Sequence, residues 1–115
     1  MVTLLNRIRR ENPALHADWR LAFHATDNDQ LVCYSKSTPG LDNVIVTVVN
    51  LDPLYRQSGW VDLDLAELGL GPGQSYAVRD LLTDARYAWH GSHNYVELDP
   101  RRFPAHILLV NPGEP

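Results

Sequence analysis

The 115-residue sequence has 10 lysines and arginines against 14 aspartates and glutamates, giving a formal net charge of -4 at pH 7. A chain of this length fits one domain with a hydrophobic core, and its scattered arginines form no basic stripe that could follow nucleic-acid phosphates. No apolar run approaches the roughly 20 residues of a membrane span and one cysteine cannot form an internal disulfide, so we expect a cytoplasmic protein without a nucleic-acid or membrane partner.

The first predicted element is a short amphipathic helix over Leu4–Glu11. Leu4, Leu5 and Ile8 recur at helical spacing, and Thr3 precedes them as a possible N-cap. Pro13 lacks an amide proton, and it disfavours helical geometry at the residue before it. We therefore expect the helix to end at Asn12-Pro13.

From Trp19 onward the pattern changes to short runs rich in Val, Ile, Leu and aromatic residues, separated by turn residues. The runs lie near residues 20–25, 31–37, 43–51, 60–65, 75–82, 85–90, 94–99 and 105–110. Such spacing is typical of a β-sandwich or β-barrel. The sequence therefore predicts an all-β protein, a Greek-key antiparallel β-sandwich of about eight strands preceded by one short helix.

Two of these runs also predict their own environment. Residues 43–50 are apolar at nearly every position, which predicts a central strand that is buried on both faces. Residues 61–65 alternate between apolar and acidic, which predicts one face in water. Cys33 lies within an apolar run and is expected to be a small buried hydrophobic residue.

Paired carboxylates are the first candidates for catalysis. Asp62 and Asp64 would lie about 6.5 Å apart on one strand face, near the separation that glycosidases use. A general acid, however, needs a partly desolvated site that raises its pKa, whereas the alternation places both residues on the wet face. A solvated strand face is therefore the favoured interpretation.

The histidines are weak candidates for a metal site. His90 and His93 lie on either side of Gly91, without a second cysteine or paired carboxylates nearby. The sequence also contains no glycine-rich phosphate loop leading into a helix and no GxSxG motif. We therefore expect no metal, no cofactor and no catalytic residue in this chain.

Aromatic residues are the remaining candidates for binding. Exposed rings can stack against the CH groups of a sugar, although buried rings that fill the core are the commoner case. Trp60, Trp89 and Tyr95 are the candidates for carbohydrate contact.

Several segments in fixed order resemble one known family. They are RIRRENPAL (7–15), FHATDNDQLVCYSK (23–36), VVNLDPLYRQSGWVDLDLAELGL (48–70) and DLLTDARYAWHGSHNYVELDPRRFPAHILLV (80–110). These segments resemble the C-terminal β-sandwich of the α-amylase superfamily, in the bacterial α-1,4-glucan:maltose-1-phosphate maltosyltransferases. The sequence departs from the family pattern at Leu54, where many relatives have histidine, and at Asp84, where glycine is common.

The resemblance implies a division of labour within a longer enzyme. The catalytic aspartate and glutamate of that family belong to a preceding barrel domain and have no counterpart here. Residues 1–18 would be the last helix and linker of that barrel, and residues 19–115 the C-terminal domain. The chain is then a non-catalytic accessory domain whose partner is the barrel; the alternatives are a stand-alone module that binds α-glucan and, as the weakest, an independent enzyme.

Two further expectations follow from the resemblance. The helix would have lost its packing partner, so the isolated chain should self-associate through Leu4, Leu5 and Ile8, with Leu15 and Trp19 as further candidates for the patch, or else its helix should fray. Residues Trp89–Tyr95 would form a hairpin between two C-terminal strands, with Gly91 at the turn and Trp89 near Tyr95 across the strands.

Overall fold

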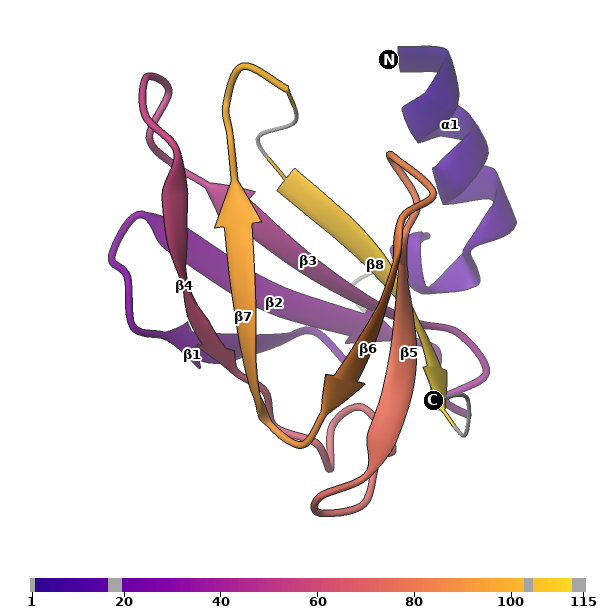
Figure 1. The fold of residues 1–115 in the computed structure, drawn as a ribbon. Coiled ribbons are helices and arrows are strands. Elements are labelled where there is room, and N and C mark those ends of the chain that lie inside the picture. Colours follow the sequence, from indigo (N-terminus) through magenta and orange to yellow (C-terminus); the bar gives the residue numbers. More distant parts are fainter. Residues whose placement is uncertain (1, 17–19, 103–104, 113–115) are drawn as a thin grey trace.

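The computed structural model describes residues 2–16, 20–102 and 105–112 and shows eight strands preceded by a short helix (Figure 1). Helix α1 spans Val2–Glu11, and a 3-10 helix, η1, spans Pro13–Leu15. The strands are β1 (Ala22–Thr26), β2 (Leu31–Ser37), β3 (Val44–Asn50), β4 (Gln57–Asp62), β5 (Ser75–Asp80), β6 (Arg86–His90), β7 (His93–Leu98) and β8 (Ala105–Pro112). The predicted all-β class and N-terminal helix are confirmed, and each predicted run overlaps one strand, although β4 (Gln57–Asp62) begins three residues before the run predicted near 60–65. Thr3 lies within α1, so the prediction that it caps the helix is wrong.

The eight strands form one antiparallel sheet in the order β6-β5-β8-β3-β2-β1-β4-β7. β3 lies inside the sheet between β2 and β8 and is buried along almost its whole length, which confirms the predicted central strand. The two edge strands, β6 and β7, are consecutive in the chain and are joined by Gly91 and Ser92. The sheet is therefore curled until its edges meet at this turn, which gives a nearly closed, barrel-like sheet (Figure 1).

The prediction of a hairpin at residues 89–95 is wrong in its pairing. Gly91 does supply the turn, with a positive φ of 64°. However, β6 pairs with β5, so that Trp89 lies opposite Tyr76, and β7 pairs with β4, so that Tyr95 lies opposite Trp60. Sequence proximity favoured a local hairpin, but each strand found its partner in a distant segment instead.

The inward faces of the strands form the core. Its buried residues come from β2 to β8 and from the β4–β5 connection, and include Val46, Val48, Val61, Leu63, Tyr76, Val78 and Leu108. Asp62 and Asp64, which alternate with Val61 and Leu63, are both exposed, and their exposure confirms the predicted wet face. Strand β4 itself ends at Asp62, so Asp64 lies just beyond it. Cys33 is buried as expected, and burial raises the pKa of its thiol to about 12.

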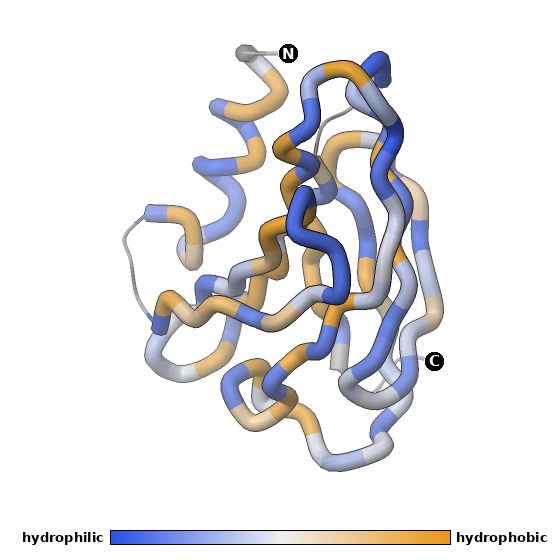
Figure 2. The backbone as a smooth tube through the Cα atoms, turned by 90° about the vertical axis from the view of Figure 1, so that its left-hand side faces the viewer, coloured by the Kyte–Doolittle hydropathy of each residue, from blue (hydrophilic) through white to orange (hydrophobic). Residues whose placement is uncertain are grey.

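Helix α1 stands beside the sheet, with hydrophilic and hydrophobic residues in turn along its length (Figure 2). Its C-terminal end is attached through Asn12, whose side-chain amide donates to the Ile8 carbonyl at 2.9 Å. The Asn43 amide donates to Asn12 Oδ1 at 3.0 Å, and Asn43 Oδ1 accepts the Ala14 N–H at 2.9 Å. These bonds join the helix to the start of β3.

The expectation that α1 lacks a packing partner is wrong for Ile8, which is only 4% exposed. It holds for Leu5, which is 39% exposed, while Leu4 and Leu15 are half-buried. The helix therefore folds back in part onto its own domain. Trp19, which was expected to extend the same apolar patch, lies outside the described residues.

Asn94 ties the two edges of the sheet together at the Gly91–Ser92 turn. Its side-chain amide on β7 donates to the Tyr76 hydroxyl on β5 at 3.1 Å and to the Gly91 carbonyl at 3.1 Å. The Tyr76 hydroxyl in turn donates to Gly91 O at 2.8 Å. Burial raises the pKa of Tyr76 to about 12, so its hydroxyl keeps the proton that it donates.

We expect Asn94→Ala to lower the free energy of unfolding by about 1–3 kcal/mol, because it leaves the buried Tyr76 hydroxyl and the Gly91 carbonyl with fewer partners. Urea denaturation of the two chains at pH 7 measures the difference. Tyr76→Phe and the double variant complete a mutant cycle. Additive effects of the two substitutions would contradict a shared network.

Candidate functional site

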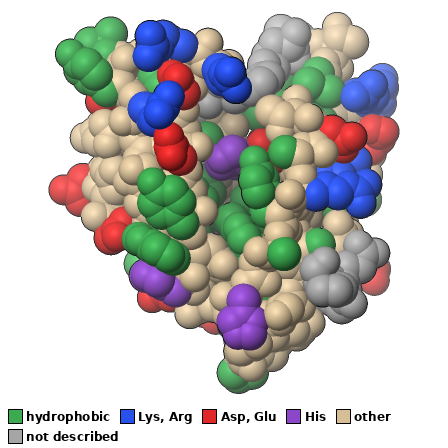
Figure 3. Space-filling view, viewed as in Figure 1, with side chains coloured by type: hydrophobic (Ala, Val, Ile, Leu, Met, Phe, Trp, Pro, Cys, Tyr) green, Lys and Arg blue, Asp and Glu red, His purple; other side chains and the backbone are tan. Residues whose placement is uncertain are grey.

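Three aromatic side chains form an exposed cluster on the outer face of β4 and β7. Trp60 stacks against His93 with ring centroids 4.7 Å apart and an interplanar angle of 5°, and meets Tyr95 edge to face at 5.6 Å. Trp60 is 41% and Tyr95 49% exposed. Figure 3 shows hydrophobic and histidine side chains together over this part of the sheet, and we call these three residues the aromatic cluster.

The β1–β2 turn holds the backbone under the aromatic cluster. Asp27 Oδ1 accepts the Trp60 N–H at 2.8 Å, and the Asp27 N–H donates to the Trp60 carbonyl at 3.2 Å. A Cβ atom at Gly59 would lie 2.6 Å from Asp27 Oδ1, so a glycine is needed for this close approach. The Trp60 ring is therefore carried by a fixed segment of strand.

Trp89, the third predicted carbohydrate contact, lies apart from the aromatic cluster. It is 9% exposed and belongs to the core, where it meets Tyr76 edge to face at 6.4 Å. The structure thus places Trp60 and Tyr95 together on the surface and Trp89 largely inside.

A second feature is a groove between the two sheet edges, which we call the seam groove. It consists of two adjoining hollows of about 430 and 310 Å³ that share Tyr87, Glu97 and His106. The larger hollow is polar and is also lined by Arg56, Asp80, Asp99 and Arg102; the smaller one is lined by Trp89, Tyr95, Val96 and Leu108. Figure 3 shows the molecule hollowed near its centre, with a histidine in the hollow and charged side chains around it.

Asp80 and His106 form a hydrogen-bonded pair in the seam groove. Asp80 is 1% exposed; its Oδ2 lies 2.7 Å from His106 Nδ1, and its Oδ1 accepts the Leu82 N–H at 2.9 Å. Burial alone would raise the pKa of Asp80, but the hydrogen bonds from His106 and Leu82 and the attraction of His106 outweigh it and hold the pKa below its ordinary value. The Tyr87 ring meets the His106 ring edge to face at 6.2 Å.

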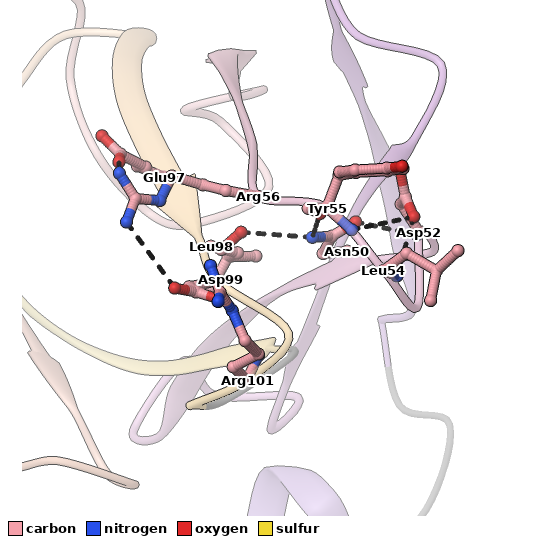
Figure 4. A network of polar contacts seen from close by, with 9 residues as sticks. All are labelled: Asn50, Asp52, Leu54, Tyr55, Arg56, Glu97, Leu98, Asp99 and Arg101. Carbon is pink, nitrogen blue, oxygen red and sulfur yellow. Dashed lines mark hydrogen bonds and ion pairs between the residues drawn. The ribbon is translucent and has the colours of Figure 1, made fainter.

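Arg56 joins the rim of the seam groove to the β3–β4 loop (Figure 4). Its guanidinium pairs with Glu97 at 3.1 Å and with Asp99 at 3.6 Å. At the base of the loop, the Asn50 amide donates to the Tyr55 and Leu98 carbonyls, each at 3.1 Å. Asp52 Oδ1 accepts the backbone N–H groups of Leu54 and Tyr55, and its pKa is lowered mainly by the Leu54 bond.

The described residues that line the seam groove include no serine or cysteine, and the Asp80 carboxylate is occupied by His106 and the Leu82 amide. Asp62 and Asp64 face solvent.

The histidines of the turn point to different partners. His90 Nδ1 lies 2.9 Å from the Ser75 hydroxyl, whereas His93 stacks on Trp60.

His24 on β1 is buried between Ser35 and the Asp64 amide. Burial lowers the pKa of His24, and the negative charges of Asp64 and Glu67 partly offset this lowering. Among residues 2–16, 20–102 and 105–112, no three His, Cys, Asp or Glu side chains are grouped so that they could hold a metal ion.

Sequence reasoning missed the seam groove and its Asp80–His106 pair. Asp80 and His106 are 26 positions apart and meet only because β5 pairs with β8, where Asp80 lies opposite Leu108. The usable signal was an acidic residue and a histidine at strand positions where apolar residues were expected. No helix in the described part of the chain is long and apolar enough to cross a membrane.

Comparison with known protein families gives a match over most of the chain. Residues 23–110 match the family described as "GLGE, C-terminal". Alpha-1,4-glucan:maltose-1-phosphate maltosyltransferase 1 of Streptomyces coelicolor is 47% identical over 116 residues, covering 100% of this chain and 17% of the relative. Maltosyltransferase 2 of the same organism is 50% identical over 110 residues, covering 96% of this chain and 16% of the relative. The maltosyltransferase of Rhodospirillum rubrum is 43% identical over 112 residues, covering 97% of this chain and 16% of the relative.

Solved structures show the same fold at low sequence identity. The maltogenic alpha-amylase AmyB of Thermotoga neapolitana superposes with a TM-score of 0.68 at 14% identity, over 94% of this chain and 24% of the amylase. An Anoxybacillus alpha-amylase superposes with a TM-score of 0.66 at 20% identity, over 99% of this chain and 22% of the amylase. The barrel-like sheet is therefore of the kind found in these amylases.

We expect Asp80→Asn to destabilise the chain by about 2 kcal/mol at pH 7, because it removes a charged acceptor from His106 and Leu82. A carboxylate whose folded pKa is lowered contributes stability that is present above its unfolded pKa, near 3.8, and is lost as pH falls through the folded pKa. The stability gap between the two chains should therefore narrow below pH 3.8. Urea denaturation from pH 7 to 3 measures it, and a gap that does not change with pH would contradict the ionised pair.

Proposed function

Because the chain belongs to the GLGE C-terminal family, we propose that it is a non-catalytic accessory domain of an enzyme that extends α-1,4-glucan with maltosyl units from maltose 1-phosphate. The observation that carries the proposal is the alignment itself. The maltosyltransferases match this chain over 95% or more of its length in several bacteria, yet the chain spans only about a sixth of theirs. The remaining length of such an enzyme would hold the catalytic domain.

The proposal divides the chain at its N-terminal side. Residues 1–18 would be the helix and linker that come from the end of the catalytic domain, and residues 19–115 the accessory domain. In support, α1 stands beside the sheet rather than within it, and its described hydrogen bonds to the sheet are at its C-terminal end, through Asn12 and Asn43 (Figure 1).

A cleft of about 630 Å³ separates α1 from the sheet and is the surface proposed for the catalytic domain. Its apolar lining comes from both sides and includes Leu4, Ile8, Leu81, Leu82 and Leu109. A side chain from the catalytic domain would enter this cleft, and Leu5, which is exposed on the helix outside the cleft, would add a second apolar contact. Without that domain, the same surface would favour association between copies of the chain.

The strand connections support a finer description of the fold. The first four strands lie in the order β4-β1-β2-β3, which is the order of a Greek key. We propose that the two flanks of the curled sheet pack face to face as the layers of a sandwich.

A second candidate function is a stand-alone carbohydrate-binding module, favoured by the aromatic cluster. Exposed rings on a fixed strand are a common surface for sugar stacking. Titration of the chain with glycogen tests it: binding that is lost in Trp60→Ala would support the module, and binding that is unchanged in this variant would remove its basis.

A chimera tests the accessory role. We expect the chain to replace the matching region of Streptomyces coelicolor maltosyltransferase 1, 47% identical, and to give an enzyme that releases phosphate from maltose 1-phosphate and unfolds at a higher temperature than a variant lacking the region. The chain alone is the control and should release none. A deletion variant as active and as stable as the intact enzyme would contradict the proposal.

Sedimentation tests the surface of α1. We expect the isolated chain to show an average mass that rises with concentration and falls to that of a monomer in Leu5→Glu, because the charge opposes burial of the exposed helix face. Tyr55→Glu, at a residue 69% exposed and far from α1 in sequence, is the matched control. A monomer at all concentrations would show that α1 does not mediate association.

A further inference from the structure

The seam groove has the size and shape of a small-ligand site. Its two hollows, about 430 and 310 Å³, share lining residues and so form one continuous depression between β6 and β7. Ligand pockets commonly measure roughly 300–1,000 Å³ and combine apolar walls with a few fixed polar groups. The groove has both, with the polar groups gathered in the larger hollow.

Aromatic rings line the groove from both edges of the sheet. Tyr87 on β6 is 42% exposed and Tyr95 on β7 is 49% exposed, and both line the smaller hollow. Trp89, Val96 and Leu108 lie deeper in the same hollow. Two half-exposed rings around an apolar floor suit a flat ligand with CH groups on its faces, such as a pyranose ring.

The polar groups of the groove are already held in position. Glu97 and Asp99 are paired with Arg56, and His106 is oriented by the buried Asp80. Groups fixed before binding lose little conformational entropy when a ligand arrives. Carboxylates and guanidinium groups can each engage two neighbouring hydroxyl groups at once, which is the pattern that a sugar presents.

The charges indicate an uncharged ligand. The larger hollow carries two arginines against three carboxylates, Arg56, Arg102, Asp80, Glu97 and Asp99. Arg56, one of the two arginines, is already paired with two of these carboxylates. A phosphate or a carboxylate ligand would meet an excess of negative charge there.

The geometry of the edges disfavours a peptide strand as the occupant. β6 and β7 diverge from the Gly91–Ser92 turn (Figure 1), whereas a strand pairing with both would need a nearly constant spacing of about 4.8 Å to each edge.

We propose that the seam groove binds a short neutral oligosaccharide, with Tyr87 and Tyr95 stacking on sugar rings and Arg56, Glu97 and His106 bonding to hydroxyl groups. Its identity as an α-1,4-linked glucan rests on the proposed function. The site differs from the surface expected from the sequence, because Tyr87 and His106 take part and Trp60 does not.

Titration of the isotopically labelled chain with maltoheptaose, followed by NMR, tests the site. We expect millimolar binding, with amide shifts confined to β6, β7 and residues near His106. Tyr87→Ala should weaken binding roughly tenfold, because one stacking surface is lost. Tyr55→Ala, at a more exposed tyrosine outside the groove, should leave the Kd unchanged, and circular dichroism checks that each variant is folded.

The outcomes separate the possibilities. Loss of binding in Trp60→Ala but not in Tyr87→Ala would overturn the groove in favour of the aromatic cluster. No detectable binding of maltoheptaose at about 10 mM would overturn the groove as a site for α-glucan. Cellohexaose, which is β-linked, is the control: equal binding of both sugars would keep the groove and remove its α-glucan identity. Because the titration uses no catalytic domain, its failure would leave the accessory role, tested by the chimera, untouched.

Discussion

The hydrogen bonds of Asn94 are the constraint on which the shape of this domain depends. An eight-stranded antiparallel sheet could remain open, with β6 and β7 as two distant edges. Asn94 on β7 instead bonds to Tyr76 on β5 and to Gly91 in the turn, and the Leu63 amide bonds to the Ser92 carbonyl at 2.8 Å. The edges are therefore fixed together at one end, and the seam groove is the opening that remains where they diverge.

Polar networks keep the other end of the sheet equally well defined. Asn50 and Asp52 bond to backbone groups of the β3–β4 loop, and Arg56 links that loop to Glu97 and Asp99 beyond it (Figure 4). Exposed ion pairs contribute little to stability, so the value of the Arg56 pairs lies mainly in their geometry. The rim of the groove is thus formed by side chains that pair with one another across the β3–β4 loop and the end of β7.

The domain separates two surfaces that serve different proposed roles. The cleft under α1 combines apolar residues on both walls, among them Leu4, Ile8 and Leu109, with charged residues such as Arg7, Glu11 and Arg79, a mixture that is usual in contacts between protein domains. The seam groove combines aromatic rings with two arginines and three carboxylates, the mixture of apolar walls and a few polar groups that is usual in small-ligand sites. Because different residues line the two surfaces, with only Thr83 in common, an accessory domain could dock through one and bind glucan through the other.

The sequence by itself determined the local elements and the family, whereas tertiary structure decided the pairing and the groove. Apolar runs and turn residues act over a few neighbours, so the strand near residues 44–50 and the turn at Gly91 were predictable. Strand partners depend on long-range burial, which is why Trp89 and Tyr95 were expected to face each other and instead lie opposite Tyr76 and Trp60. Ile8 was expected to be exposed, but it is buried in the folded chain. Asp80 and His106 form a hydrogen bond because folding brings two distant segments together. Periodicity says which face of a strand is apolar, but the identity of the neighbour across that face is set by the packing of the whole sheet.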